Sequence, residues 1–281
     1  MAKRRLTTAA LILIFLLGLA LLLYPSLSNW YNTRYASRVI STYQDNVSEL
    51  DEQSYAQILL SAKEYNDANQ SFGEFTLSPE QEADYLAQLD ISGTGIMGYL
   101  EIPKLNVSLP IYHGSSEGVL QVAIGHLEWS DLPVGGSDTH CVLTGHRGLP
   151  NARLFTDLPD MELGDVFYIQ VLDEVLTYEV DQILTVLPNE VEEIMPEEGQ
   201  DYCTLLTCTP YGINTHRLLV RGHRVANEEA ARTITVTADA VRVESLVIAP
   251  FIALPILLVL LLIVLFDGRR RKKNNSMRES Q

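Results

Sequence analysis

Residues 202–225, YCTLLTCTPYGINTHRLLVRGHRV, contain two runs rich in β-forming residues on either side of a turn. The runs cover 202–207 and 217–225, and the Pro, Tyr and Gly at 210–212 between them are typical of a turn. Five more short runs, broken by Gly and Pro, precede them: 97–102, 106–112, 141–144, 166–172 and 176–186. This spacing predicts a mostly β fold whose strands close into a barrel.

Two long apolar stretches lie near the ends of the 281-residue chain, at 6–24 and 245–266, and neither contains a charged residue. At about 1.5 Å of rise per residue, a helix of either length reaches the ~30 Å thickness of a bilayer core. We therefore expect a transmembrane helix at each position. A cleaved signal peptide is the alternative for the first stretch, because Ser26-Leu27-Ser28 loosely resembles a cleavage site.

Charge is distributed unevenly along the chain, whose formal net charge is −16. Between the two apolar stretches stand 11 basic and 34 acidic residues, whereas basic clusters at 3–5 and 269–273 flank them on the outside. Cytoplasmic segments carry an excess of Lys and Arg, so we expect both termini in the cytoplasm and the acidic middle outside the cell membrane. Its negative charge repels phosphate backbones, which argues against a nucleic-acid partner.

The domain organisation follows from these features and from a helical signal before the barrel. Residues 29–69 contain neither Gly nor Pro, and Ser78-Pro79-Glu80-Gln81 is typical of a capped helix start. The predicted parts are a cytoplasmic tip with N-terminal anchor (1–25), an extracytoplasmic helical region (26–95), the barrel (96–226), a polar stalk (227–244), a C-terminal transmembrane helix (245–266) and a basic cytoplasmic tail (267–281).

Three cysteines and six histidines could carry chemistry. Their spacing argues against a structural zinc site and leaves a cysteine nucleophile paired with a distant histidine. Cys208 follows the strand at 202–207, and His146 follows the short run at 142–145. Each residue stands where a strand meets a loop, so its side chain would be held firmly and still be accessible. The alternative for both is a residue at a strand end with no catalytic role. The other five histidines are expected to be structural: His113, His126, His140, His216 and His223.

The sequences around Cys208 and His146 resemble the signature motifs of the sortase family. They are TLLTC at 204–208, with Arg217 nine residues after the cysteine, and LTGHRG at 143–148. Three more stretches match the family: MGYLEIPK at 97–104, GHL at 125–127 and LPVGG at 132–136. The resemblance extends over about residues 98–224, nearly the whole β section.

The resemblance implies an eight-stranded barrel and a cysteine transpeptidase on the outer face of a Gram-positive membrane, with no metal or other cofactor. It implies that Cys208 is the nucleophile, that His146 is the acid/base, and that Arg217 stabilises the oxyanion or positions the substrate. A thiolate is the attacking form, and a nearby imidazolium both favours it and can protonate the leaving amine. Pairing with a surface carboxylate is the alternative for Arg217. Thr207 and Leu206 are candidate substrate-binding residues.

Within the family the chain is similar to class C, the pilin-polymerising sortases, through its second apolar stretch, its helical lead-in and residues 207–217. Such enzymes cleave a Leu-Pro-x-Thr-Gly (LPxTG) sorting signal between Thr and Gly, and a lysine amine of another pilin subunit resolves the thioacyl intermediate. The expected partners are pilin or surface-protein substrates with C-terminal LPxTG-type signals. A sortase that uses a peptidoglycan precursor as acceptor and a non-catalytic surface scaffold are the alternatives.

Three further features leave alternatives open. Many class C sortases carry a lid with an Asp-Pro-aromatic triplet, which this sequence lacks; Phe72 or Phe75 could plug the site or pack against the barrel. Cys141 and Cys203 could form a disulfide if their strands lie side by side, or remain buried thiols. The acidic stretch at 190–201 could bind calcium or form a solvated loop.

Overall fold

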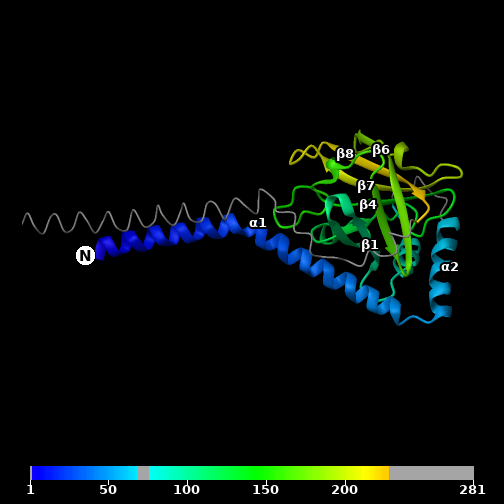
Figure 1. Cartoon of the computed structure of the whole chain (residues 1–281), viewed down its shortest axis with the longest axis horizontal. Coiled ribbons are helices and arrows are strands. Elements are labelled where there is room, and N and C mark those ends of the chain that lie inside the picture. The colour runs from blue at the N-terminus through cyan, green and yellow to red at the C-terminus, as the bar shows by residue number, and fades with distance from the viewer. Residues whose placement is uncertain (1, 69–75, 228–281) are drawn as a thin grey trace, which may run out of the picture. The chain divides into compact units, whose positions relative to one another are not determined.

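The computed structural model describes residues 2–68 and 76–227 (Figure 1). Within this part the chain separates into two compact units, one up to Trp30 and the other from Tyr31 onward. Three helices precede the strands: α1 (Ala2–Ser48), α2 (Glu52–Ala68) and α3 (Pro79–Ala87). The first unit contains the beginning of α1, and the second contains the rest of α1, α2, α3 and all the strands.

The N-terminal part of α1 exposes a series of large apolar side chains, among them Leu13, Leu17 and Leu21. Among the described residues, α1 is the helix long and apolar enough to cross a membrane. A signal sequence near the N-terminus would meet the same criteria of length and composition. The first predicted transmembrane stretch therefore falls on a helix of suitable length. The second, at 245–266, lies outside the described residues with the tail and nearly all of the stalk, so the prediction of two transmembrane helices is not confirmed.

Eight strands close into a barrel, as predicted, and their order around it is β1-β2-β3-β4-β7-β8-β6-β5. The strands are β1 (Ile96–Ile102), β2 (Val107–His113), β3 (Ile124–His126), β4 (Thr139–Thr144), β5 (Val166–Val171), β6 (Glu174–Val186), β7 (Asp201–Thr209) and β8 (His216–Val225). Short helices lie between them: η1 (Pro103–Leu105), α4 (Glu117–Leu120), η2 (Leu158–Asp160) and η3 (Glu192–Ile194). Seven strands coincide with the β-rich runs of the sequence. The eighth, β3, is only three residues long, too short to show a periodic pattern.

The pairing of β7 with its two neighbours determines where the strand ends meet. β7 pairs in parallel with β4, from Thr139 opposite Asp201 to Thr144 opposite Leu206. On its other side β7 pairs antiparallel with β8. The carboxyl end of β4, the carboxyl end of β7 and the amino end of β8 therefore lie together at one end of the barrel.

Successive side chains of these strands point to opposite faces. Leu143 of β4 and Leu205 of β7 belong to the large core inside the barrel. Val142 of β4 faces the other way and is buried against Ile194 of η3 and Leu219 of β8. The odd-numbered residues of β7 thus point inward, and the even-numbered ones point to the outer surface.

The helical region is fixed to the barrel by buried polar contacts. The Asn66 amide of α2 donates to the Leu132 carbonyl and accepts from the Leu132 N–H, at 3.2 and 2.8 Å. The Tyr85 hydroxyl of α3 lies 3.0 Å from Nδ1 of His126. The predicted capping box at Ser78 is present, with hydrogen bonds in both directions to Gln81. The barrel and the helices of this unit therefore share one core.

The buried carboxyl of Glu101 on β1 yields a prediction about stability. The side chain is 8% exposed, and burial raises its pKa from an ordinary 4.5 to about 7. Ionising it therefore disfavours the folded state progressively as the pH rises from 4.5 through 7. We expect Glu101→Gln to exceed the wild type in unfolding free energy at pH 8 by roughly 1 kcal/mol, with the difference shrinking towards pH 4.5. Denaturant unfolding of the detergent-solubilised chain at both pH values measures this, and a difference independent of pH contradicts it.

Candidate active site

Cys208 and Arg217 lie directly opposite each other at one end of the β7–β8 ladder. Opposed residues of an antiparallel pair carry their side chains on the same face, and for Cys208 this is the outer face of the barrel. The thiol is partly buried, and the Arg217 guanidinium donates to the carbonyls of Asn214 and His216, at 3.3 and 3.1 Å. Within the described part of the chain, no carboxylate forms an ion pair with Arg217.

His146 reaches the same place from the other side of β7. The N–H of Gly145 donates to the Leu206 carbonyl at 3.1 Å, one step beyond the last β4–β7 pair. Continuing this parallel register one more step brings His146 level with Cys208. The imidazole is partly exposed, and its Nε2 faces the Glu117 carboxylate of α4 at 3.4 Å. The three residues predicted to be catalytic thus gather at adjoining strand ends, two from neighbouring strands and one from the loop that follows β4.

Local sequence explains why the chain before His146 keeps this path. A Cβ on Gly145 would lie 2.8 Å from the Phe155 ring, so only glycine fits there without a shift. The Thr207 hydroxyl donates to the Gly145 carbonyl at 2.7 Å. Thr207 is only 1% exposed, and its side chain holds the chain before His146. The prediction that Thr207 binds substrate stays a prediction, and the structure places its side chain on the inward face of β7.

Leu206 lies on the same outer face as Cys208, beside a buried apolar cluster. It is half-buried against a cluster formed by Val142, Ile194 and Leu219. The prediction that Leu206 contacts substrate stays a prediction. Leu206 lies two residues before Cys208 on the outer face, and this position is compatible with a substrate contact.

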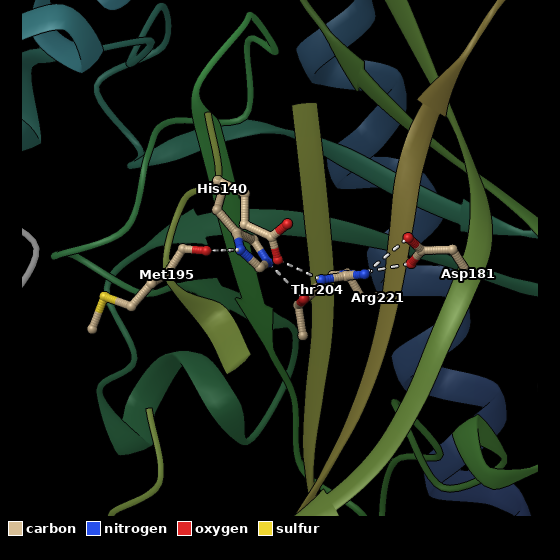
Figure 2. Close-up of polar contacts among 6 residues, drawn as sticks. His140, Asp181, Met195, Thr204 and Arg221 are labelled. Carbon is tan, nitrogen blue, oxygen red and sulfur yellow. Dashed lines mark hydrogen bonds and ion pairs between the residues drawn. The ribbon is translucent and has the colours of Figure 1, made fainter. Parts of the chain in front are cut away.

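Further along this face, polar contacts fix the connection between β6 and β7 (Figure 2). The Met195 carbonyl can only accept, so Nδ1 of His140, 3.0 Å away, carries the hydrogen; Nε2 then accepts from the Thr204 hydroxyl at 2.7 Å. Burial lowers the pKa of His140 to about 4, so the ring is neutral at pH 7. Arg221 forms two contacts of 3.1 Å with the Asp181 carboxylate. His140 is therefore structural, as are His113 and His126, which hold backbone carbonyls.

Glu117 is the group beside the site that sequence reasoning missed. Its side chain is 71% exposed, and its pKa is lowered by a hydrogen bond from Gln121 and, to a smaller degree, by His146. Nothing local in the sequence marks it, because the packing of α4 next to β3 is what brings it near His146. It is placed to accept a hydrogen bond from the imidazole.

Cys141 and Cys203 are register partners in the β4–β7 ladder, so their strands do lie side by side. Both are buried free thiols in the structure, which is the alternative to the disulfide. Burial raises the pKa of the Cys141 thiol well above its usual range, so it is a poor nucleophile. The predicted lid residues Phe72 and Phe75 lie outside the described residues.

The acidic stretch at 190–201 is engaged in hydrogen bonds and ion pairs. Glu190 accepts from the Leu187 N–H, Glu197 pairs with Arg221 at 3.2 Å, and Asp201 accepts from the Tyr178 hydroxyl. In the part of the chain that the structure describes, no three His, Cys, Asp or Glu side chains are grouped as metal ligands would be.

Comparison with known proteins agrees with this geometry. The sortase domain model matches residues 100–225. Sortase C1 from Streptococcus agalactiae is 53% identical with a TM-score of 0.66, over 68% of this chain and 100% of that one. The chain belongs to the sortase family. Sortase family members are cysteine transpeptidases, so the cysteine, histidine and arginine found together here are the residue types that this chemistry uses.

Other sortases are similar to this one at lower identity. Sortase C from Streptococcus pneumoniae is 42% identical with a TM-score of 0.60, over 68% of this chain and 97% of that one. Sortase D from Bacillus subtilis is 30% identical over 131 residues, which are 46% of this chain and 63% of that protein. The chain spans between 51% and 66% of the length of three curated sortases that it matches. Its solved structural neighbours include several class C sortases.

Replacing Thr207 tests its hydrogen bond to Gly145. We expect Thr207→Val to lower the unfolding free energy by about 1–2 kcal/mol, because the buried Gly145 carbonyl loses its side-chain donor. Thr207→Ser keeps the hydroxyl and is the matched control, with only a small loss from the missing methyl. Thermal unfolding of the three proteins measures the effect. Equal losses in the two variants would contradict the prediction, because Thr207→Ser keeps the hydroxyl and Thr207→Val keeps the methyl group.

Proposed function

We propose that this sortase is a membrane-anchored transpeptidase of class C. It cleaves an LPxTG-type sorting signal between Thr and Gly and joins the threonine carbonyl to a lysine amine of another pilin subunit. The observation that carries the proposal is the placement of Cys208 opposite Arg217 at the end of the β7–β8 ladder, with the segment that leads to His146 in register beside β7. The roles below are inferred from this geometry and from the family.

In the first half-reaction the Cys208 thiolate attacks the carbonyl carbon of the Thr–Gly bond. Arg217, whose charge cannot be lost, stabilises the oxyanion of the tetrahedral intermediate. The intermediate collapses by breaking the C–N bond, and His146 gives its proton to the departing glycine amine. The product is a thioester between Cys208 and the threonine carbonyl.

In the second half-reaction a neutral lysine amine of the acceptor attacks this thioester. His146, now neutral, accepts the proton of the attacking amine, and the C–S bond breaks to release the Cys208 thiolate. The new bond is an isopeptide. The imidazolium and the thiolate are thereby restored, so the cycle needs no external acid, base or oxidant.

The location of the enzyme is part of the proposal. The apolar beginning of α1 would anchor the chain in the membrane, with the barrel on the outer side and both termini in the cytoplasm. The division into anchor, helical region, barrel, stalk, second transmembrane helix and tail is retained as predicted. Pilin as the substrate is supported by the class C neighbours, among them the S. pneumoniae sortase C, which was described for its pilin substrate specificity.

Intact mass spectrometry of the detergent-solubilised chain with an LPxTG peptide tests the proposed nucleophile. We expect a mass increase equal to the peptide fragment that ends at threonine less one water, absent from Cys208→Ala. Arg217→Ala should slow acylation by about 10²–10³-fold, because an oxyanion donor is lost. Acylation of Cys208→Ala, or none of the wild type, would contradict the proposal.

The acceptor is tested by supplying the acylated enzyme with competing amines. A lysine-containing pilin peptide should be joined in preference to a peptidoglycan-type amine. The reverse preference would favour the cell-wall-anchoring alternative. An enzyme that is never acylated would point to the non-catalytic scaffold.

A further inference from the structure

The residues that follow His146 contact the residues that follow Cys208. Nη1 of Arg147 donates to Oγ1 of Thr209 at 3.1 Å. One residue further on, Gly148 lies against the ring of Tyr211, so closely that a Cβ on the glycine would lie 2.7 Å from the ring. These contacts continue the connection between the two segments beyond the last β4–β7 pair, Thr144 with Leu206.

Hydrogen bonds within the loop after His146 also join its beginning to residues 155 and 156. Nε of Arg147 donates to the Thr156 carbonyl at 3.3 Å, and the N–H of Gly148 donates to the Thr156 hydroxyl at 3.1 Å. The N–H of Phe155 donates to the His146 carbonyl at 3.1 Å. The loop therefore closes back on the residue that carries the imidazole, and the same guanidinium bridges it to the end of β7.

We propose that Arg147, Gly148, Thr209 and Tyr211 form a latch that sets the position of His146 relative to Cys208, with Arg147 as its main positioning residue. The inference rests on the proposed roles of His146 and Cys208. Sheet pairing holds the chain only as far as Gly145, so the latch supplies the restraint on the other side of His146. A displacement of about 1 Å between reacting groups can cost 10²-fold in rate, so a restraint here has catalytic consequences.

An arginine suits this role for a geometric reason. Its planar fork can donate to two acceptors in fixed directions, Thr156 on the loop and Thr209 on the strand. A lysine keeps the charge but lacks the fork. The guanidinium also lies 5.9 Å from the centre of the Tyr211 ring, within the range of a cation–π contact.

The competing explanation is electrostatic, since a positive charge near Cys208 favours its thiolate without any latch. The variants separate position from charge. Thr209→Val removes the acceptor and leaves the Arg147 charge in place, while Thr209→Ser keeps the acceptor as a matched control. Arg147→Lys keeps the charge and loses the fork, and Arg147→Met loses both. Glu117, which faces His146, and Arg217, which lies opposite Cys208, are unchanged in all four.

The experiment measures the rate of Cys208 alkylation by iodoacetamide from pH 5 to 9 in the full chain. Cys141 and Cys203 are buried, and mass spectrometry assigns the modified residue. We expect Thr209→Val and Arg147→Lys to alkylate about tenfold more slowly at pH 7 and to need a higher pH for half-maximal rate. Thr209→Ser should keep the wild-type profile, and thermal unfolding establishes that each variant is folded.

Kinetics with the sorting-signal peptide give the second readout. We expect Thr209→Val to lower kcat about 10–100-fold and to change KM less than twofold, because the reacting groups rather than the peptide are displaced. Wild-type profiles in both Thr209→Val and Arg147→Lys, with an effect only in Arg147→Met, would assign Arg147 a charge role and overturn the latch. If the wild type fails to transfer peptide while the alkylation profiles still shift, the proposed function fails and the latch stands.

Discussion

The parallel ladder between β4 and β7 is the constraint on which the rest of the site depends. The ladder joins two strands that are separated in sequence by residues 145–200. Just beyond it, the Thr207 hydroxyl bonds to the carbonyl of Gly145, 62 residues away in sequence. Closing a loop of this length costs conformational entropy, and that cost grows only slowly with loop length. Leu143 and Leu205, which face inward from the two strands into the barrel core, offset that cost. This pairing brings the segment that leads to His146 alongside the strand that ends near Cys208.

The two faces of these strands have different roles. The inner face of β4 and β7 is buried, with Leu143 and Leu205 in the barrel core, which gives the strand ends a closely packed base. The outer face changes character along its length, from the His140–Thr204 contacts through the apolar cluster around Val142 to the thiol at Cys208. Because side chains alternate, Thr207 and Cys208 serve these two roles from adjacent positions. The Thr207 hydroxyl holds the chain before His146 from the inner face, and Cys208, the proposed nucleophile, lies on the outer face.

Much of the fold and the three proposed catalytic residues could be predicted from sequence, since both are encoded locally. The β-rich runs and turns mark seven strands, Ser78 and Gln81 mark a helix start, and family motifs mark Cys208 and His146. What could not be predicted depends on contacts between distant segments. The approach of Glu117 to His146, the inward direction of Thr207 and the bond from Arg147 to Thr209 all arise from packing of distant segments. Short motifs therefore mark the proposed reacting groups, whereas the contacts around them emerge only from the folded chain.

The central claim is that residue 146 lies level with residue 208, and a disulfide trap tests it most directly. Cysteines can be bridged only when their Cα atoms lie within about 4.4–6.8 Å. His146→Cys in the full chain, treated with a mild thiol oxidant, should form a bond to Cys208 that peptide mapping detects. The same substitution combined with Cys208→Ala should give no cross-link. Failure of the folded His146→Cys chain to cross-link to Cys208 would contradict the account.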